Sequence, residues 1–421
     1  MDDRFLAYKI LSKIERDKAY SNIALDTVLN QNEVSSAPFV CALVYGVIER
    51  KITLDYYLSQ FLTQPIKKLN PQVLTILRMG TYQIKFMDKV PVSAAVNESV
   101  KLSKKVKCGF ASGLINSVLR KISSTEIYFP ETDNKIYDLS IRYSCPESLV
   151  NHFVNNYSYI KAEEILKASI GEVPLFLRVN TLKTNSMDLI KHLADEGINA
   201  KSCGNGTTIE ILDGSAVFKT NAYSKGYFHA QDLASQDCVT NLAPDENDIV
   251  FDMCAAPGGK SFTMAEIMNN KGTIYSFDLY DHKIKLINDG AKRLGIDIVN
   301  AQIGDAAEFN PDLPKADKIL CDVPCAGLGV IRRKPEIKYK DFGFIDKLCE
   351  LQYNILNNAS LYLKDKGVLM YSTCSLSKKE NEEVCRRFLD EHKDFRNDGM
   401  VTMFPRENHS DGFFYARLIR E

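Results

Sequence analysis

The sequence contains no long apolar run, no Cys-x-x-Cys pair and no tract of biased composition. Its longest nearly apolar run, residues 39–48, is far shorter than the roughly 18 residues that span a bilayer, so no membrane-spanning helix is expected. The first residues lack the basic start and apolar stretch of a signal peptide, so we expect a cytoplasmic protein. A 45% hydrophobic share and a 25% charged share are typical of globular chains, and 421 residues predict more than one domain.

The eleven cysteines include no Cys-x-x-Cys pair, and no histidines are spaced to complete a zinc site. Because the number is odd, a complete disulfide framework would leave at least one thiol unpaired. We therefore expect reduced thiols and no bound metal. For a cysteine that lies outside any cleft, the ordinary role is that of a small buried hydrophobic residue.

The net charge of −1 conceals a basic part and an acidic part. Residues 1–125 contain 18 Lys and Arg against 10 Asp and Glu, a net charge of +8, which leaves −9 for the rest of the chain. Such a basic part favours contact with a nucleic-acid backbone, although a solvated charged face would give the same count. The densest cluster, which we expect to contact RNA, consists of Lys101, Lys104, Lys105 and Lys107.

Hydrophobic periodicity divides the chain into three parts. Apolar residues recur at helical spacing up to about Lys121, which predicts an all-helical domain at residues 1–125. After a polar linker, residues 135–235 combine helices with short strands and predict a small α+β connector that binds RNA. Residues 236–421 alternate strands with helices, which is typical of a parallel, Rossmann-like α/β sheet. The strands expected in that sheet are 249–253, 273–278, 298–303, 318–322 and 368–373.

Ligands of such sheets bind beyond the carboxyl ends of the strands, so the residues that follow each strand carry the chemistry. After the first strand, two glycines allow close backbone approach, and the start of the next helix favours an anionic group. Asp278 is placed to accept the ribose hydroxyls of a nucleoside cofactor, and Asp305 suits its adenine amine. The ordinary role of a single aspartate at such a position is to cap a helix. Three of them after strands of one sheet, Asp278, Asp305 and Asp322, favour a cofactor site. The loop itself comprises Cys254, Ala255, Ala256, Pro257, Gly258, Gly259 and Lys260.

Two other nucleotide-binding patterns are absent from this loop. The Gly-x-Gly-x-x-Gly pattern of dinucleotide folds does not occur, and a phosphate-binding P-loop would require glycine where Cys254 stands. A dinucleotide and a P-loop-bound nucleotide are therefore both disfavoured, and S-adenosylmethionine remains as the expected cofactor.

Two cysteines follow the fourth and fifth strands, Cys325 after Pro324 and Cys374 after Thr373. Carbon 5 of cytosine is a poor nucleophile until a thiolate adds to carbon 6, so its methylation needs a cysteine beside the methyl donor. Asp322 can bond to the ring as charge develops. The alternative is a pair of buried thiols at strand ends, but their shared sheet edge favours catalysis. The pattern alone does not say which of the two thiols attacks.

These segments resemble the RNA 5-methylcytosine methyltransferase family. The signature segments that are similar are 254–260, 322–327, 373–375 and 411–416, and two further similar segments are 178–181 and 231–236. The N-terminal part resembles the NusB-like domain of those members that modify bacterial small-subunit ribosomal RNA, in residues 77–83, 94–98 and 113–120. The resemblance spans nearly the whole chain.

The resemblance implies a class I methyltransferase fold with Cys374 as the nucleophile and Cys325 as an aid to product release. It places Lys260 and Asp322 in the catalytic site, and Arg178 and Asn180 among the expected RNA contacts. The expected reaction is methylation of carbon 5 of a cytosine in small-subunit (16S) ribosomal RNA, by a monomer that binds neither membrane nor metal. The alternatives are the same chemistry on transfer RNA and a non-catalytic ribosome assembly factor. The intact set of thiols, lysine and aspartate argues against the second.

Overall fold

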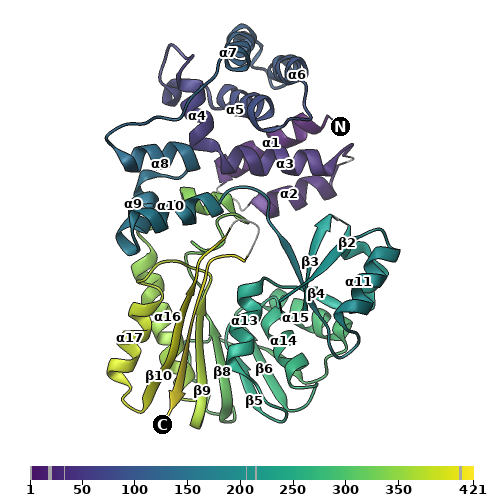
Figure 1. Cartoon of the computed structure of the whole chain (residues 1–421), viewed down its shortest axis with the longest axis vertical. Coiled ribbons are helices and arrows are strands. Elements are labelled where there is room, and N and C mark those ends of the chain that lie inside the picture. The colour runs from purple at the N-terminus through teal and green to yellow at the C-terminus, as the bar shows by residue number, and fades with distance from the viewer. Residues whose placement is uncertain (1, 18–20, 33, 205, 214–215, 407–409) are drawn as a thin grey trace. The chain divides into compact units, whose positions relative to one another are not determined.

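The computed structural model describes residues 2–17, 21–32, 34–204, 206–213, 216–406 and 410–421. The chain forms two compact units (Figure 1). The first comprises Met1–Gly171 with Ile331–Lys340, and the second comprises Glu172–Val330 with Asp341–Glu421. Within the described ranges, no helix is both long and apolar enough to cross a membrane.

The first unit is helical, which confirms the prediction for its N-terminal part. This unit extends to Gly171 and so includes residues 135–171, which the sequence analysis above grouped with the connector. Its helices are α1 (Asp3–Asp17), α2 (Ser21–Asn30), α3 (Ala37–Glu49), α4 (Lys51–Ser59), α5 (Pro71–Phe86), α6 (Val92–Lys105), α7 (Ser112–Ser124), α8 (Lys135–Tyr143), α9 (Glu147–Asn156) and α10 (Tyr159–Ala168), with short 3-10 turns η1 (Ile66–Lys68), η2 (Gly109–Ala111) and η4 (Pro335–Tyr339).

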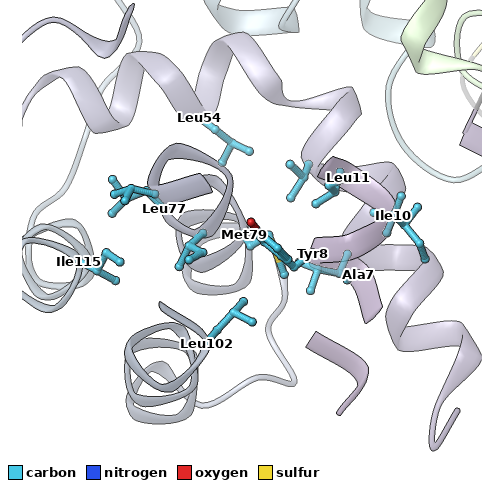
Figure 2. Close-up of a cluster of buried hydrophobic side chains, with 14 of the residues drawn as sticks. Ala7, Tyr8, Ile10, Leu11, Leu54, Leu77, Met79, Leu102 and Ile115 are labelled. Carbon is cyan, nitrogen blue, oxygen red and sulfur yellow. The ribbon is translucent and has the colours of Figure 1, made fainter. Parts of the chain in front are cut away.

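Helix α5 is central to this unit. It begins where the side chain of Asn70 accepts hydrogen bonds from the backbone N–H groups of Gln72 and Val73, with Pro71 in the first turn. Leu77 and Met79 of α5 meet side chains of α1, α4, α6 and α7 in a continuous apolar core (Figure 2). Burial of this apolar surface is the main stabilising contribution to the helical unit.

A distant segment, Ile331–Lys340, belongs to the same unit and contacts α3 through η4. Ser21 donates to the Glu336 carboxylate from its backbone nitrogen at 3.0 Å and from its hydroxyl at 2.9 Å. Lys338 is 1% exposed, and its Nζ donates to the carbonyl oxygen of Glu49 at 2.7 Å. Because burial disfavours the ammonium form, the pKa of Lys338 falls to about 8.

This lowered pKa predicts a pH-dependent stability. The folded chain releases the Lys338 proton near pH 8, whereas the unfolded chain holds it to a pH of about 10.4. The free energy of unfolding should therefore rise with pH over that window, by at most about 1.4 kcal/mol per pH unit. Lys338→Met removes this contribution while keeping an extended apolar side chain. Urea unfolding of both proteins between about pH 7 and pH 10, followed by circular dichroism, tests the prediction, and a pH-independent difference would contradict it.

The second unit contains the predicted α+β connector, built on a four-stranded antiparallel sheet of order β2-β3-β1-β4. Strand β2 has a mostly polar sequence, Asn-Ala-Lys-Ser-Cys, and each of its residues is exposed or partly exposed. The elements are β1 (Leu175–Val179), α11 (Ser186–Asp195), β2 (Asn199–Cys203), β3 (Thr208–Asp213), η3 (Val217–Lys219), α12 (Asn221–Ser224) and β4 (Phe228–Ala230).

The rest of the second unit is a seven-stranded sheet of order β10-β11-β9-β8-β5-β6-β7, in which β11 runs antiparallel to its neighbours β9 and β10 and the other neighbouring pairs are parallel. Helices α16 and α17 pack on one face, and α13, α14 and α15 pack on the other (Figure 1). This confirms the predicted Rossmann-like domain. Its elements are α13 (Leu233–Leu242), β5 (Ile249–Asp252), α14 (Gly259–Ile267), β6 (Thr273–Asp278), α15 (Asp281–Leu294), β7 (Val299–Ile303), β8 (Ala316–Asp322), α16 (Ile345–Ser360), β9 (Leu363–Thr373), α17 (Glu382–Glu391), β10 (Phe395–Met403) and β11 (Phe413–Arg420).

Candidate active site

The predicted site residues follow the carboxyl ends of neighbouring parallel strands. Strand β5 pairs with β6 on one side and with β8 on the other, so the chain direction of the crossovers reverses at β5. Ligands of open α/β sheets bind at such a switch point. The loop after β5, Asp322 at the end of β8 and the thiol after β9 therefore lie at the edge of the sheet where a ligand is expected.

Gly258 gives the loop after β5 its shape. Its φ of +105° lies in the left-handed region, and a Cβ there would lie 2.4 Å from the ring of Phe262. Its N–H donates to the carbonyl oxygen of Ala255 at 2.7 Å, and the N–H of Ala255 donates to that of Phe277 at 2.8 Å. The loop therefore forms a tight turn that is hydrogen-bonded to β6, and it leads directly into the first turn of α14.

Gly258→Ala should destabilise the second unit. The left-handed backbone costs an alanine about 1–2 kcal/mol, and the contact with Phe262 adds to this cost. Gly259→Ala is the matched control, because its Cβ would first meet Gln231 Nε2 at an ordinary 3.9 Å. Thermal unfolding should show a lower midpoint for Gly258→Ala and little change for Gly259→Ala. Equal midpoints for the two variants would count against a special role for Gly258.

A buried polar network under this loop was not predicted from the sequence. Ser261 Oγ donates to Asp252 Oδ2 at 2.7 Å and lies 2.8 Å from Ser276 Oγ. Asp252 is 1% exposed, and burial raises its pKa to about 7 against the opposing effect of the Ser261 hydrogen bond. Because Asp252 ends a hydrophobic strand, the only sequence signal was one carboxylate among apolar neighbours.

The two predicted cofactor aspartates lie in different environments. Asp278 ends β6, is 8% exposed and lies 3.3 Å from Lys283 Nζ. Asp305 follows β7, is exposed and accepts a hydrogen bond from the N–H of Ala307 at 2.9 Å. Asp278 therefore lies at the sheet edge beside the glycine loop, whereas Asp305 also makes the local turn contact that an aspartate ordinarily makes.

Lys260 and Asp322 form an ion pair across the switch point. Lys260 Nζ lies 2.6 Å from Asp322 Oδ2, and Ser372 Oγ donates to Oδ1 at 2.8 Å. Burial lowers the pKa of Lys260, but the attraction of Asp322 and their hydrogen bond outweigh that effect and raise it. Lys260 is thus held charged, and the Asp322 carboxylate is fixed in direction by two donors.

The two predicted thiols meet, with Cys325 Sγ 3.2 Å from Cys374 Sγ. The hydrogen bond to Cys374 is the largest cause that raises the pKa of Cys325, and burial adds to it. Two thiols this close do not both ionise readily, because the second negative charge would face the first. The raised pKa keeps Cys325 neutral, and either thiol can donate the hydrogen bond between them.

Backbone contacts explain why the segment 411–416 accompanies the thiols in the sequence motifs. Gly329 donates its N–H to the carbonyl oxygen of Cys374 at 2.9 Å, and Gly412 donates to the carbonyl oxygen of Gly329 at 2.9 Å. A Cβ on Gly329 would lie 2.0 Å from the Gly412 carbonyl oxygen. The start of β11 thus packs directly on the loop after Cys325.

Arg178 and Asn180 lie inside the second unit rather than on its surface. Arg178 is 4% exposed and pairs with Glu266 at 2.9 Å, with Nε as donor. Asn180 is 0% exposed, and its Nδ2 donates to the carbonyl oxygens of Gly226 and Leu294, both at 2.8 Å. An RNA contact would require these bonds to open, so we assign both side chains to the attachment of the connector to the catalytic domain and do not propose them as RNA contacts.

The lysine cluster of α6 and the following turn is exposed. Lys101 pairs with Glu98 at 2.7 Å, and Lys105 lies 3.7 Å from Asp2 and over the ring of Phe5. Lys104 and Lys107 are exposed beside them. Exposed ion pairs of this kind are weak, so these lysines can exchange their protein partners for phosphates.

Comparisons with known proteins match all three parts of the chain. The sequence pattern described as "16S rRNA methyltransferase RsmB/F" covers residues 239–419, that of the NusB family covers 1–124, and that of an RsmF/B-like ferredoxin-like domain covers 145–215. A Bacillus subtilis protein named "Probable ribosomal RNA small subunit methyltransferase B" is 36% identical, covering 99% of this chain and 98% of its own. The Photorhabdus laumondii "Ribosomal RNA small subunit methyltransferase B" is 31% identical, covering 91% and 90%. A crystal structure of a methyltransferase homologue from Pyrococcus horikoshii, 26% identical, covers 69% of this chain and 100% of its own with a TM-score of 0.62.

Proposed function

Because the chain belongs to the RsmB/F family of 16S rRNA methyltransferases, we propose that it methylates carbon 5 of a cytosine in small-subunit ribosomal RNA through a covalent cysteine adduct. The observation that carries this proposal is the thiol pair Cys325–Cys374, 3.2 Å apart and at the same edge of the sheet as the Lys260–Asp322 ion pair. Carbon methylation of a pyrimidine needs a thiol to activate the ring and a group to release it. A non-catalytic assembly factor would need neither.

The residues around the glycine loop fit S-adenosylmethionine, which supplies the methyl group when bound. The loop after β5 offers backbone at the start of α14, which suits the carboxylate of an amino-acid tail. Asp278, at the end of the adjacent strand, would accept hydrogen bonds from the ribose hydroxyls, and Asp305 from the adenine amine. We propose these residues, with Cys254 to Lys260 and Asp322, as the cofactor site.

The two thiols would act in sequence. The Cys374 thiolate forms a bond to carbon 6, and the electrons of the ring double bond make carbon 5 nucleophilic, with Asp322 and Lys260 placed to bind the ring as its charge develops. Once carbon 5 carries the methyl group, its proton must leave so that the bond between sulfur and carbon 6 can break. By then Cys374 is a thioether and carries no charge, so one of the causes that raise the pKa of Cys325 is removed. We propose that Cys325, which lies against Cys374, serves as the base.

Substitution of each thiol should separate the two halves of the reaction. Cys374→Ala should abolish both methylation and the covalent adduct, because no nucleophile is left. Cys325→Ala should allow attack and methyl transfer but slow release, so that enzyme remains bound to RNA. A denaturing gel with radiolabelled RNA should show a persistent shifted band for Cys325→Ala alone.

Cys41→Ala, a partly buried thiol of the helical unit, is the control and should behave as the natural chain does. The opposite pattern, with the shifted band in Cys374→Ala, would make Cys325 the nucleophile. Absence of an adduct in all variants would argue against cysteine-mediated carbon methylation.

The RNA substrate is tested separately. Bisulfite sequencing of ribosomal and transfer RNA from cells with and without the gene should show one cytosine of the small-subunit RNA losing its 5-methyl group. A loss confined to transfer RNA would mean that the same reaction takes place on that substrate instead.

We propose that Lys101, Lys104, Lys105 and Lys107 add affinity for the RNA backbone, in keeping with their exposure.

A further inference from the structure

A buried carboxylate outside the predicted site bonds to both cysteine loops. Glu380 precedes α17 and is 0% exposed. Its Oε1 accepts the backbone N–H of Ala326, the residue after Cys325, at 2.7 Å. Its Oε2 accepts the hydroxyl of Ser375, the residue after Cys374, at 2.5 Å. One side chain therefore holds the two peptides that carry the thiols.

Gln352 of α16 extends this connection to the other side of Cys325. Its Nε2 donates to Glu380 Oε1 at 3.1 Å and to the carbonyl oxygen of Pro324 at 2.9 Å. The residues before and after Cys325 are thus both bonded to the same buried pair, and Gln352 is itself 0% exposed. The loop after β8 is fixed to α16 and to the turn before α17.

The hydrogen bonds that reach the Glu380 carboxylate in the described structure come from neutral donors. Burial raises the pKa of Glu380, and the bonds from Ser375, Ala326 and Gln352 oppose that effect. A carboxyl group buried without a cation is costly for stability. What it provides in return is two acceptor oxygens, one for each loop, which an amide cannot supply because its second atom is a donor.

We propose that Glu380 is a positioning residue that sets the separation and direction of Cys325 and Cys374. The inference rests on the proposed function, in which the thiols act one after the other on the same ring. Displacement of a reacting group by about 1 Å can lower a rate by roughly 100-fold. Release of either loop from Glu380 would produce a displacement of this kind without removing either thiol.

The test compares Glu380→Gln with Glu383→Gln, an exposed glutamate three residues along that loses the same charge. Glu380→Gln should lower kcat for RNA methylation by at least about 10-fold. The KM for RNA, and the affinity for S-adenosylmethionine measured by calorimetry, should each stay within about twofold. The reason is that Glu380 bonds neither to the proposed cofactor residues nor to the lysines proposed to bind RNA. Glu383→Gln should match the natural chain. A folded Glu380→Gln protein with unchanged kcat would overturn the proposal.

A second measurement needs neither RNA nor methyl transfer. Diamide oxidises two thiols to one disulfide by taking up two hydrogens, and peptide mass spectrometry gives the rate at which Cys325 joins Cys374. At a sulfur separation of 3.2 Å the natural chain should react quickly, and Glu380→Gln should react about 10-fold more slowly. If the natural chain methylates no RNA but this difference appears, the proposed function fails and the positioning role stands. If both proteins form the disulfide at the same rate, the positioning role fails.

Ser375→Ala carries the test if Glu380→Gln does not fold, because it removes one of the two connections and leaves the carboxylate in place. It should slow both methylation and disulfide formation severalfold, with the cofactor affinity unchanged. Ser375→Thr, which keeps the hydroxyl, should restore part of both rates. Natural rates in a folded Ser375→Ala protein would overturn the proposal.

Discussion

The register between β8 and β9 is the constraint on which the active site depends. Asp322 pairs with Ser372 in this parallel ladder, and Ser372 donates to the Asp322 carboxylate. Cys325 lies three residues beyond Asp322, and Cys374 lies two beyond Ser372. A shift of one residue would turn every side chain of a strand to the other face and separate the thiols. Backbone pairing deep in the sheet therefore determines the chemistry at its edge.

The surroundings of this edge combine several buried polar groups with the apolar core. Asp252, Glu380 and Gln352 are almost fully buried, and each contacts a loop that carries a predicted functional residue. An apolar core would be cheaper, since each buried polar group must be satisfied by its neighbours. The apolar contacts between the sheet and the helices on its two faces stabilise the domain. The polar networks at the carboxyl edge can therefore fix the orientation of the functional side chains.

Much of the catalytic fold and of the candidate site could be predicted from the sequence, because both depend on patterns between residues that are close along the chain. The alternation of strands and helices, the glycine loop and the two cysteines after β8 and β9 identified the fold and the thiol pair. Strands β10 and β11 were missed; in β10 only the first residue is buried, the others are exposed or partly exposed, and no clear alternation results. Glu380 was missed for another reason: a glutamate in a charged stretch reads as a surface residue until the fold buries it.

At Arg178 the resemblance implied an RNA contact, whereas the structure shows a buried side chain paired with Glu266. Motif similarity says that a residue matters, but it does not separate binding from packing. Arg78 of the helical unit illustrates the same point, since it is buried and pairs with Asp55 and Glu15, both at 2.7 Å. A buried arginine that lost its partners would leave an uncompensated charge, so such residues tolerate little change for structural reasons alone.

The course of the chain after Cys325 restricts how the protein can be divided for study. The loop that carries Cys325 ends at Val330, and the next ten residues belong to the helical unit. There Lys338 is buried against the end of α3, and Ile337 is 4% exposed. A fragment without the helical unit would leave residues 331–340 without the partners that they contact in the full chain, next to the thiol loop in sequence. The chemistry of the catalytic domain should therefore be measured on the full chain.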